Sequence, residues 1–320
     1  MKNTLKAGIL ILWAALVPLL NSCFKEPTVP VVVTKTVEGV TQSDALVKGS
    51  VNNDGGEIVT ARGICWSTSP GPTIDKNKIL SGEGLGDFTG SLEDLVPGMK
   101  YYARAFAVNN IGTAYGNELV FSTDKLTDIE GNTYSTLDIG GQIWIAENLK
   151  TISLNDGTEL PLVPSTTEWL TTTDPGYTYY NGDPDTYAET YGALYNWYAV
   201  ATGKLCPSGW HVPSEEEMTV LIEYLGGQFV AGGKLKETGA THWKSPNTGA
   251  TDEIGFTGLP GGYKSPDGIY EYIGEYGNYY TSTDSSSIEA YRIYLSFEHK
   301  KVFMAASPKN YCFSVRCVKD

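Results

Sequence analysis

The chain has 320 residues, of which 41% are hydrophobic and 12% aromatic, so it can bury two cores of moderate size. Its 36 Gly and 16 Pro favour short strands and many turns over long helices, and we expect a β-rich protein of two domains. The net charge of −14 argues against nucleic acid as a partner, because binding to phosphates depends on Lys and Arg.

The first residues have the pattern of a secretory signal. Two lysines precede an apolar run, residues 7–20, that is too short to span a bilayer comfortably. The segment Leu20-Asn21-Ser22-Cys23 resembles the bacterial lipobox, in which a signal peptidase cuts before a cysteine that receives lipids. We therefore expect a lipoprotein signal peptide over residues 1–22, lipidation at Cys23 and a tether over residues 23–30. An ordinary signal peptide with an incidental cysteine is the alternative.

Lipidation determines where the protein is expected to reside. Several acyl chains on Cys23 would hold it at a membrane, since each buried methylene contributes about 0.8 kcal/mol. Phe24 stands where, in some bacteria, an aspartate retains lipoproteins at the inner membrane, so we expect an outer membrane lipoprotein. Glu26 resembles the acidic export signals of Bacteroides-type lipoproteins, which favours the cell surface over the periplasm and leaves both open.

Residues 31–124 are expected to form a β-sandwich. Residues 45–51 and 101–108 are rich in strand-forming residues and are bounded by Asn-Asp-Gly-Gly and Pro-Gly turns. Residues 95–101 resemble the corner of fibronectin type III domains, where a tyrosine hydroxyl bonds back to the backbone, and we assign this role to Tyr101. The resemblance implies an immunoglobulin-like spacer, with a ligand-binding module as the alternative. Cys65 is expected to be a buried free thiol.

Residues 127–320 carry the local signals of a second domain. Gly140-Gly141 divides two short predicted strands, and the apolar residues of the segment 191–201 recur at helical spacing. Ser214 and Glu217 form a capping box that predicts the start of a helix, and Gly226-Gly227 predicts its end.

A resemblance to a known family runs through this second domain. Its motifs are Leu205-Cys206-Pro207-Ser208-Gly209-Trp210-His211-Val212-Pro213-Ser214, Gly258-Leu259-Pro260-Gly261-Gly262-Tyr263 and Ser314-Val315-Arg316-Cys317-Val318-Lys319-Asp320. They resemble the Fibrobacter succinogenes major paralogous domain, whose members are exported and often lipid-anchored. The resemblance implies an α+β, C-type-lectin-like fold, also seen in sulfatase-modifying enzymes, with two helices against twisted antiparallel sheets.

Four cysteines follow Cys23 in a compartment where disulfides form, and they allow three pairings. The resemblance favours Cys206 with Cys317, because C-type-lectin-like folds tie the helix to the last strand in this way. Cys312 is then expected to be free and buried.

Catalytic and metal-binding motifs are missing from the sequence. The chain lacks the hydrolase, nucleotide and dinucleotide signatures, and its histidines, His211, His242 and His299, lack the spacing of zinc ligands. Residues 181–185 offer oxygens for calcium, but a solvated turn is the preferred interpretation. We expect no metal, no cofactor and no catalysis; the alternative is a formylglycine-generating, sulfatase-modifying-type enzyme that would need Cys312.

Aromatic residues in polar, Gly-rich segments suggest a binding role. Tyrosine offers a rigid apolar face and a hydroxyl, which suits stacking on sugars or protein loops. We select Trp243, Tyr270, Tyr272 and Tyr276 as candidate ligand-binding residues. The expected function is adhesion or recognition at the cell surface, through carbohydrate binding or a protein partner. A structural subunit of fimbriae or the envelope is a further alternative.

Overall fold

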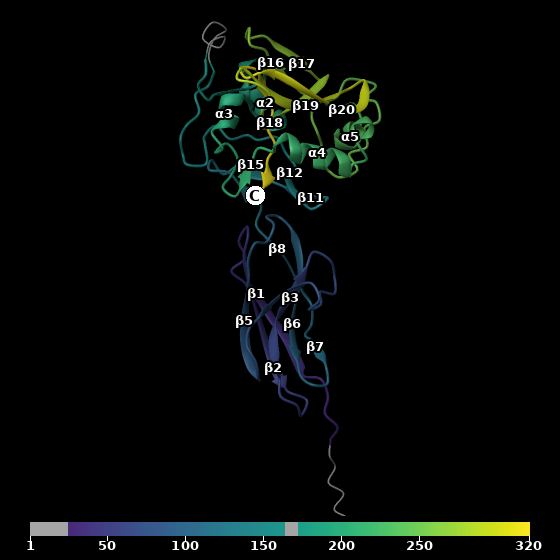
Figure 1. Cartoon of the computed structure of the whole chain (residues 1–320). Coiled ribbons are helices and arrows are strands. Elements are labelled where there is room, and N and C mark those ends of the chain that lie inside the picture. Colours follow the sequence, from purple (N-terminus) through teal and green to yellow (C-terminus); the bar gives the residue numbers. More distant parts are fainter. Residues whose placement is uncertain (1–24, 164–171) are drawn as a thin grey trace, which may run out of the picture.

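The computed structural model describes residues 25–163 and 172–320. The predicted signal peptide and the lipidation residue Cys23 lie outside the described residues. The described chain forms two modules placed end to end, with the C-terminal end of the chain at the junction between them (Figure 1).

The first module is a sandwich of two antiparallel sheets, as the sequence predicts. One sheet has the order β1 (Val31–Glu38), β2 (Ala45–Asn53), β5 (Gly86–Leu92). The other has the order β4 (Asn77–Leu80), β3 (Ala61–Ser67), β6 (Lys100–Val108), β7 (Thr113–Tyr115), and β8 (Leu119–Ser122) also pairs with β6. Alternate residues of each strand point inward and form one core, as expected for an immunoglobulin-like sandwich.

Two predictions for this module are confirmed. The hydroxyl of Tyr101 accepts a hydrogen bond from the Val96 N–H at 2.8 Å, which is the fibronectin type III corner. The Tyr101 ring also stacks on Phe121, with 5.6 Å between ring centroids. Cys65 is a free, fully buried thiol, and burial raises its pKa to about 11.

The second module begins with the hairpin of β9 (Leu126–Thr127) and β10 (Thr133–Tyr134) and contains two larger sheets. The smaller sheet has the order β11 (Thr136–Ile139), β12 (Gln142–Ile145), β22 (Val318–Lys319), β15 (Trp210–His211). The larger has the order β13 (Tyr177–Thr178), β14 (Leu194–Asn196), β21 (Cys312–Phe313), β16 (Gly261–Lys264), β18 (Tyr276–Asp284), β19 (Glu289–Ser296), β20 (His299–Pro308), and β17 (Tyr270–Ile273) pairs with β16. Pairing of β12 with β22 brings an early strand of the module beside its last strand.

Four helices lie beside these sheets: α2 (Pro184–Tyr191), α3 (Trp197–Ala201), α4 (Glu215–Tyr224) and α5 (Gln228–Leu235). The predicted capping box is confirmed, since Ser214 and Glu217 each bond to the other's backbone N–H at the start of α4. The helix predicted over residues 191–201 is shorter than expected. The Asn196 side chain accepts from the Ala199 N–H at 3.0 Å and so starts α3 only at Trp197, leaving β14 before it.

Helix α2 was not predicted. Its first two residues belong to the segment 181–185 that the sequence indicates as a solvated turn, but Asp183 Oδ1 accepts a hydrogen bond from the Thr186 N–H at 3.1 Å and caps the helix. Pro184 then occupies the first helical position, where its missing N–H is tolerated.

The helix α5 packs unusually closely on the sheet edge because it contains two adjacent glycines. A Cβ at Gly232 would lie 2.5 Å from the carbonyl oxygen of Lys301 in β20, and one at Gly233 would lie 2.2 Å from that of Gly249. Any larger residue would force the helix away from its neighbours.

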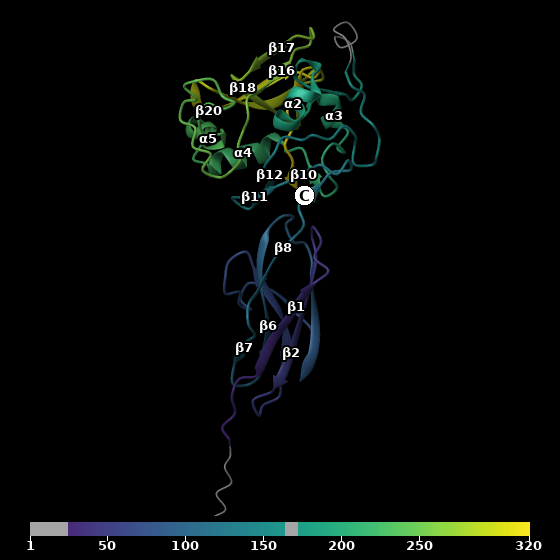
Figure 2. The ribbon, with the colours of Figure 1, turned by 180° about the vertical axis from the view of Figure 1, so that it is seen from behind.

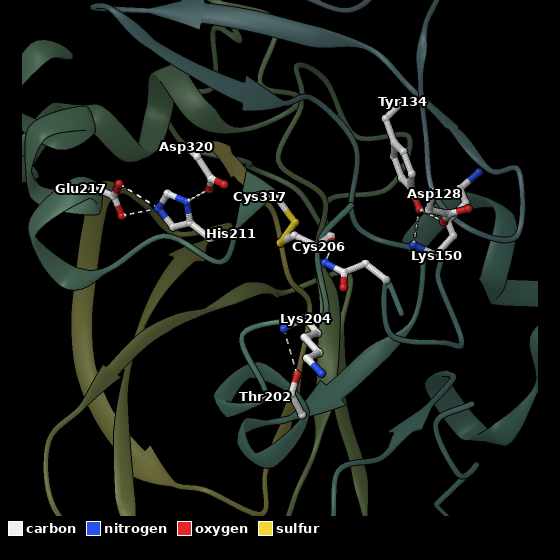
Figure 3. Close-up of a disulfide and its surroundings, with 11 residues drawn as sticks. Asp128, Tyr134, Lys150, Thr202, Lys204, Cys206, His211, Glu217, Cys317 and Asp320 are labelled. Carbon is white, nitrogen blue, oxygen red and sulfur yellow. Dashed lines mark hydrogen bonds and ion pairs between the residues drawn. A yellow bond between two sulfur atoms is a disulfide. The ribbon is translucent and has the colours of Figure 1, made fainter. Parts of the chain in front are cut away.

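A disulfide links Cys206 to Cys317, the pairing implied by the family resemblance (Figure 3). It ties the loop before α4 to the last strand, and both cysteines lie in a core of the second module. Cys312 is free and buried. Among the described helices, none is long and apolar enough to cross a membrane.

Candidate functional site

Six polar and aromatic residues of the larger sheet surround a small cavity, which we call the tyrosine pocket. Its volume is about 240 Å³, and it is lined by Tyr263, Tyr272, Tyr276, Asn278, Arg292 and Tyr294. These residues come from the strands β16 to β19. Both views show the hairpin of β16 and β17 at the end of the second module that lies away from the sandwich (Figures 1 and 2; Figure 2 is the reverse view).

The strand period and register bring these side chains to one face. Tyr276 and Asn278 are two residues apart on β18, and Arg292 and Tyr294 are two apart on β19, so each pair points to the same side of the sheet. Asn278 lies directly opposite Tyr294 in the antiparallel register. The pocket is therefore a product of pairing between distant segments.

Aromatic rings form a continuous wall of the tyrosine pocket. The ring centroids of Tyr263 and Tyr272 are 5.6 Å apart, those of Tyr272 and Tyr276 are 5.2 Å apart, and those of Tyr276 and Tyr294 are 5.9 Å apart. Edge-to-face and tilted contacts at these distances hold each ring in place. The wall is therefore preorganised to stack against the flat apolar face of a ligand.

A guanidinium and an amide supply the polar groups of the pocket. Arg292 donates from Nη1 to Asn278 Oδ1 at 2.7 Å and from Nε to Ser307 Oγ at 2.9 Å. Its guanidinium carbon lies 4.7 Å from the Tyr294 ring centroid and 4.8 Å from that of Phe313. Burial lowers the pKa of Arg292, but a guanidinium stays charged at neutral pH. Within the described part of the chain, no carboxylate forms an ion pair with it.

Tyr272 is the most exposed ring of the pocket and has a strained backbone. Its φ is 62°, in the left-handed region that bulky residues rarely adopt, because this conformation costs about 1–3 kcal/mol. Such backbone strain is concentrated at functional sites. Its side chain is 44% exposed. The conformation holds the ring between Tyr263 and Tyr276, where it is open to solvent.

Two of the four residues selected from the sequence line this pocket, Tyr272 and Tyr276. Arg292, Asn278 and Tyr294 were missed, and Tyr263 was named only as part of a family motif. The alternation of Arg292 and Tyr294 along a strand was the available signal, but only the pairing of β18 with β19 shows that they face Tyr276.

The other two selected residues lie elsewhere. Trp243 does not lie at the surface, contrary to the ligand-binding role expected of it: it is 1% exposed, and its Nε1 donates to the Gly258 carbonyl at 2.9 Å within the core. Tyr270 is half-buried and lies outside the pocket. Its hydroxyl hydrogen-bonds Thr178 Oγ1 at 2.7 Å, and its ring contacts Tyr180 with 5.6 Å between centroids.

The family model of the Fibrobacter succinogenes major domain matches residues 137–319, which is more than half of the chain and includes every residue of the tyrosine pocket. The chain belongs to this family. No curated protein matches the chain.

Several solved structures are similar to the N-terminal region of the chain, over about a third of its residues. The sensor domain of the anti-sigma factor RsgI4 of Pseudobacteroides cellulosolvens is 12% identical and covers 31% of this chain and 98% of its own, with a TM-score of 0.25. A fibronectin type III domain of the human KIAA0970 protein is 17% identical and covers 29% of this chain and 72% of its own, with a TM-score of 0.22. Because these scores are low, the sandwich assignment rests on the strand order and the Tyr101 corner.

A larger cavity, which we call the polar cleft, lies in the second module and reaches the segment that connects the two modules. Its volume is about 510 Å³. It is lined by Lys125, Gly131, Asn132, Thr133, Ala146, Glu147, Asn148, Lys150, Glu189, Thr190, Thr257, Leu259 and Arg316. Most of these side chains are polar or charged, and none is aromatic.

The thiol that an enzyme of the sulfatase-modifying type would use is poorly suited to react in this domain. Cys312 is fully buried, and burial raises its pKa far above neutrality despite the opposing effect of Lys264. A protonated thiol is a weak nucleophile. Cys317 is held in the disulfide. In the described part of the chain, His, Cys, Asp and Glu side chains form no group of three that could hold a metal ion.

A histidine joins helix α4 to the end of the chain (Figure 3). His211 Nδ1 lies 2.6 Å from Asp320 Oδ1, and its Nε2 lies 2.9 Å from Glu217 Oε1. Burial opposes the charged imidazolium, but the hydrogen bonds with the two carboxylates outweigh burial and raise the pKa of His211. This arrangement supports the capping box and is a structural contact.

Proposed function

We propose that the chain is a non-catalytic lipoprotein of the bacterial outer membrane that faces the cell surface and recognises glycans through the tyrosine pocket. The observation that carries this proposal is a wall of four tyrosines around a charged guanidinium and a buried amide. Sugar rings present apolar faces that stack on aromatic rings, while their hydroxyls accept hydrogen bonds from Arg and Asn side chains.

The size of the pocket limits what it takes. Sites for drug-sized ligands usually occupy about 300–1,000 Å³, and the tyrosine pocket has about 240 Å³. One sugar residue suits this volume better than an oligosaccharide, so the pocket would read a terminal or protruding residue of a longer glycan.

The rest of the chain supports a role at the surface. The chain belongs to a family whose members are expected to be exported and lipid-anchored, and this expectation agrees with the lipobox-like segment at Cys23. The sandwich would act as the spacer, and the second module as a C-type-lectin-like recognition domain that requires no metal or cofactor. The buried, protonated Cys312 disfavours the alternative of a sulfatase-modifying enzyme.

A glycan array tests the proposal with the chain from residue 25 to residue 320, produced under oxidising conditions. We expect saturable binding that Tyr272→Ala weakens about tenfold, the equivalent of about 1.4 kcal/mol and within the range for an aromatic contact. Tyr224→Ala is the matched control, because Tyr224 is a 61% exposed tyrosine on α4.

The control distinguishes loss of binding at the tyrosine pocket from non-specific binding to exposed tyrosines. The proposal fails if folded protein binds no glycan, or if Tyr272→Ala and Tyr224→Ala bind as tightly as the unchanged chain. Binding to a protein partner that Tyr272→Ala abolishes would replace the glycan with a protein ligand at the same pocket.

A further inference from the structure

The polar cleft has a charged residue at its floor that is almost completely removed from water. Arg316 is 1% exposed, yet it lines the cleft together with Asn148 and Thr257. It donates from Nε to Asn148 Oδ1 at 3.0 Å, from Nη2 to the Thr257 carbonyl at 3.1 Å, and from Nη1 to the Phe256 carbonyl. These bonds fix the guanidinium in one orientation.

The acceptors around Arg316 are neutral, so its charge has no direct counterion. These three hydrogen bonds use three of the five N–H donors of the guanidinium. Among the residues that the structure describes, no carboxylate lies within ion-pair distance of Arg316. The guanidinium carbon lies 4.0 Å from the Phe256 ring centroid, so the ring offsets part of the cost of burial. A buried charge without a counterion is still costly, which favours an anion at this position.

The two carboxylates that influence Arg316 from a distance are already engaged. Glu147 accepts a hydrogen bond from the Ser135 N–H at 2.9 Å. Asp252 accepts from the backbone N–H and the hydroxyl of Thr257 at 2.7 and 2.8 Å. Neither is placed to neutralise the guanidinium directly.

A second cation, the ammonium of Lys150, lines the same cleft, and the Lys150 backbone is held in position. Lys150 pairs with Glu189 at 2.9 Å, and its side chain is only 23% exposed. The Lys150 N–H donates to the Tyr134 hydroxyl at 3.0 Å, and that hydroxyl donates to Asp128 at 2.7 Å (Figure 3). The Glu189 side chain is 93% exposed and can rotate away, which would free the ammonium for a ligand.

We propose that the polar cleft is a second binding site, distinct from the tyrosine pocket, that takes an acidic saccharide with its carboxylate toward Arg316 and Lys150. Hydroxyl and amide groups of Asn132, Thr133 and Thr190 line the remaining walls and suit the hydroxyls of a sugar ring. Leu259 and Ala146 are the apolar lining residues, too few for a peptide side chain to bury well. The volume of about 510 Å³ is sufficient for one or two sugar residues.

Calorimetric titration with D-glucuronate tests this site on the chain from residue 25 to residue 320. The matched ligands are the methyl ester of glucuronate, which has nearly the same shape without the charge, and glucose. We expect the acid to bind and the ester and glucose to bind at least about tenfold more weakly, with affinity for the acid falling as salt rises.

Protein variants locate the binding. Lys150→Met should weaken glucuronate binding several-fold while keeping the fold, because its ion-pair partner Glu189 is 93% exposed and such a pair adds little to stability. Lys234→Met is the matched control, since Lys234 on α5 is also a lysine paired with a glutamate, Glu253, outside the cleft. Arg316→Lys should weaken binding further, and its melting curve shows whether it remains folded. Tyr272→Ala should leave glucuronate binding unchanged.

Several results would overturn the proposal. These are equal affinity for the acid and its ester, equal effects of Lys150→Met and Lys234→Met, or binding of N-acetyl-alanyl-alanine through its carboxylate when glucuronate does not bind. Loss of glucuronate binding in Tyr272→Ala would also overturn it, by assigning the ligand to the tyrosine pocket. If no glycan on the array binds but glucuronate does, the proposed function of the tyrosine pocket is refuted and the proposal for the polar cleft is retained.

Discussion

Removing the disulfide should destabilise the second module and leave the sandwich unchanged. Cys206 and Cys317 are 111 residues apart. In the chain-entropy model a cross-link over this separation restricts the unfolded chain enough to stabilise the fold by about 4.8 kcal/mol. For a module of this size, about 2–4 °C of melting temperature corresponds to each kcal/mol, so the double variant Cys206→Ala, Cys317→Ala should melt about 10–20 °C lower.

Differential scanning calorimetry of the two-module chain is the assay, since two modules can give two transitions that a single-transition fit would merge. The Tyr101→Phe variant identifies the transition of the sandwich, because it lies in that core. Cys312→Ala is the matched control, as it removes a buried thiol of the second module without a cross-link. The reasoning is refuted if the double variant shifts no further than Cys312→Ala, or if both transitions shift equally.

Three further predictions concern single residues. Tyr101→Phe removes the acceptor of the Val96 N–H and should cost the sandwich about 1 kcal/mol, read from its calorimetric transition. Trp243→Ala should cost about 3–5 kcal/mol in denaturant unfolding, because it empties a core site; an unchanged midpoint would contradict its burial. His211 has a raised pKa in the folded protein, so its charged form stabilises the fold, by at most about 1 kcal/mol at this partly exposed site. This stabilisation should be complete below pH 6.5 and be lost as pH rises through the raised pKa. Comparison with His211→Ala across this range checks it, and a pH-independent difference would refute it.

Features that depend on neighbouring residues were predictable from the sequence. The capping box needs only Ser214 and Glu217, which are three residues apart, and the Tyr101 corner closes on Val96, five residues before it. Because both partners of each contact lie within six residues of sequence, the local pattern indicates the contact without knowledge of distant strand pairing.

Features that depend on distant partners were not. Trp243 lies in a polar segment that suggests exposure, but the carbonyl of Gly258 satisfies its indole N–H and allows it to be buried. The tyrosine pocket needs Tyr263 on β16 to meet Tyr276 and Arg292 on two other strands. Composition indicated that tyrosines were abundant, but only the strand register decided which of them share a face.

The arrangement of the modules is consistent with the proposed role. The chain enters at the end of the sandwich opposite the second module, and the strands of the tyrosine pocket lie at the far end of that module (Figure 1). With Cys23 in a membrane, the sandwich would separate the pocket from the lipid surface. Lys125, which lies between β8 and β9, also lines the polar cleft. The two proposed sites therefore differ in position: the tyrosine pocket lies at the tip of the second module, while the polar cleft includes the segment that connects the modules. A ligand bound in the polar cleft would also contact that connecting segment.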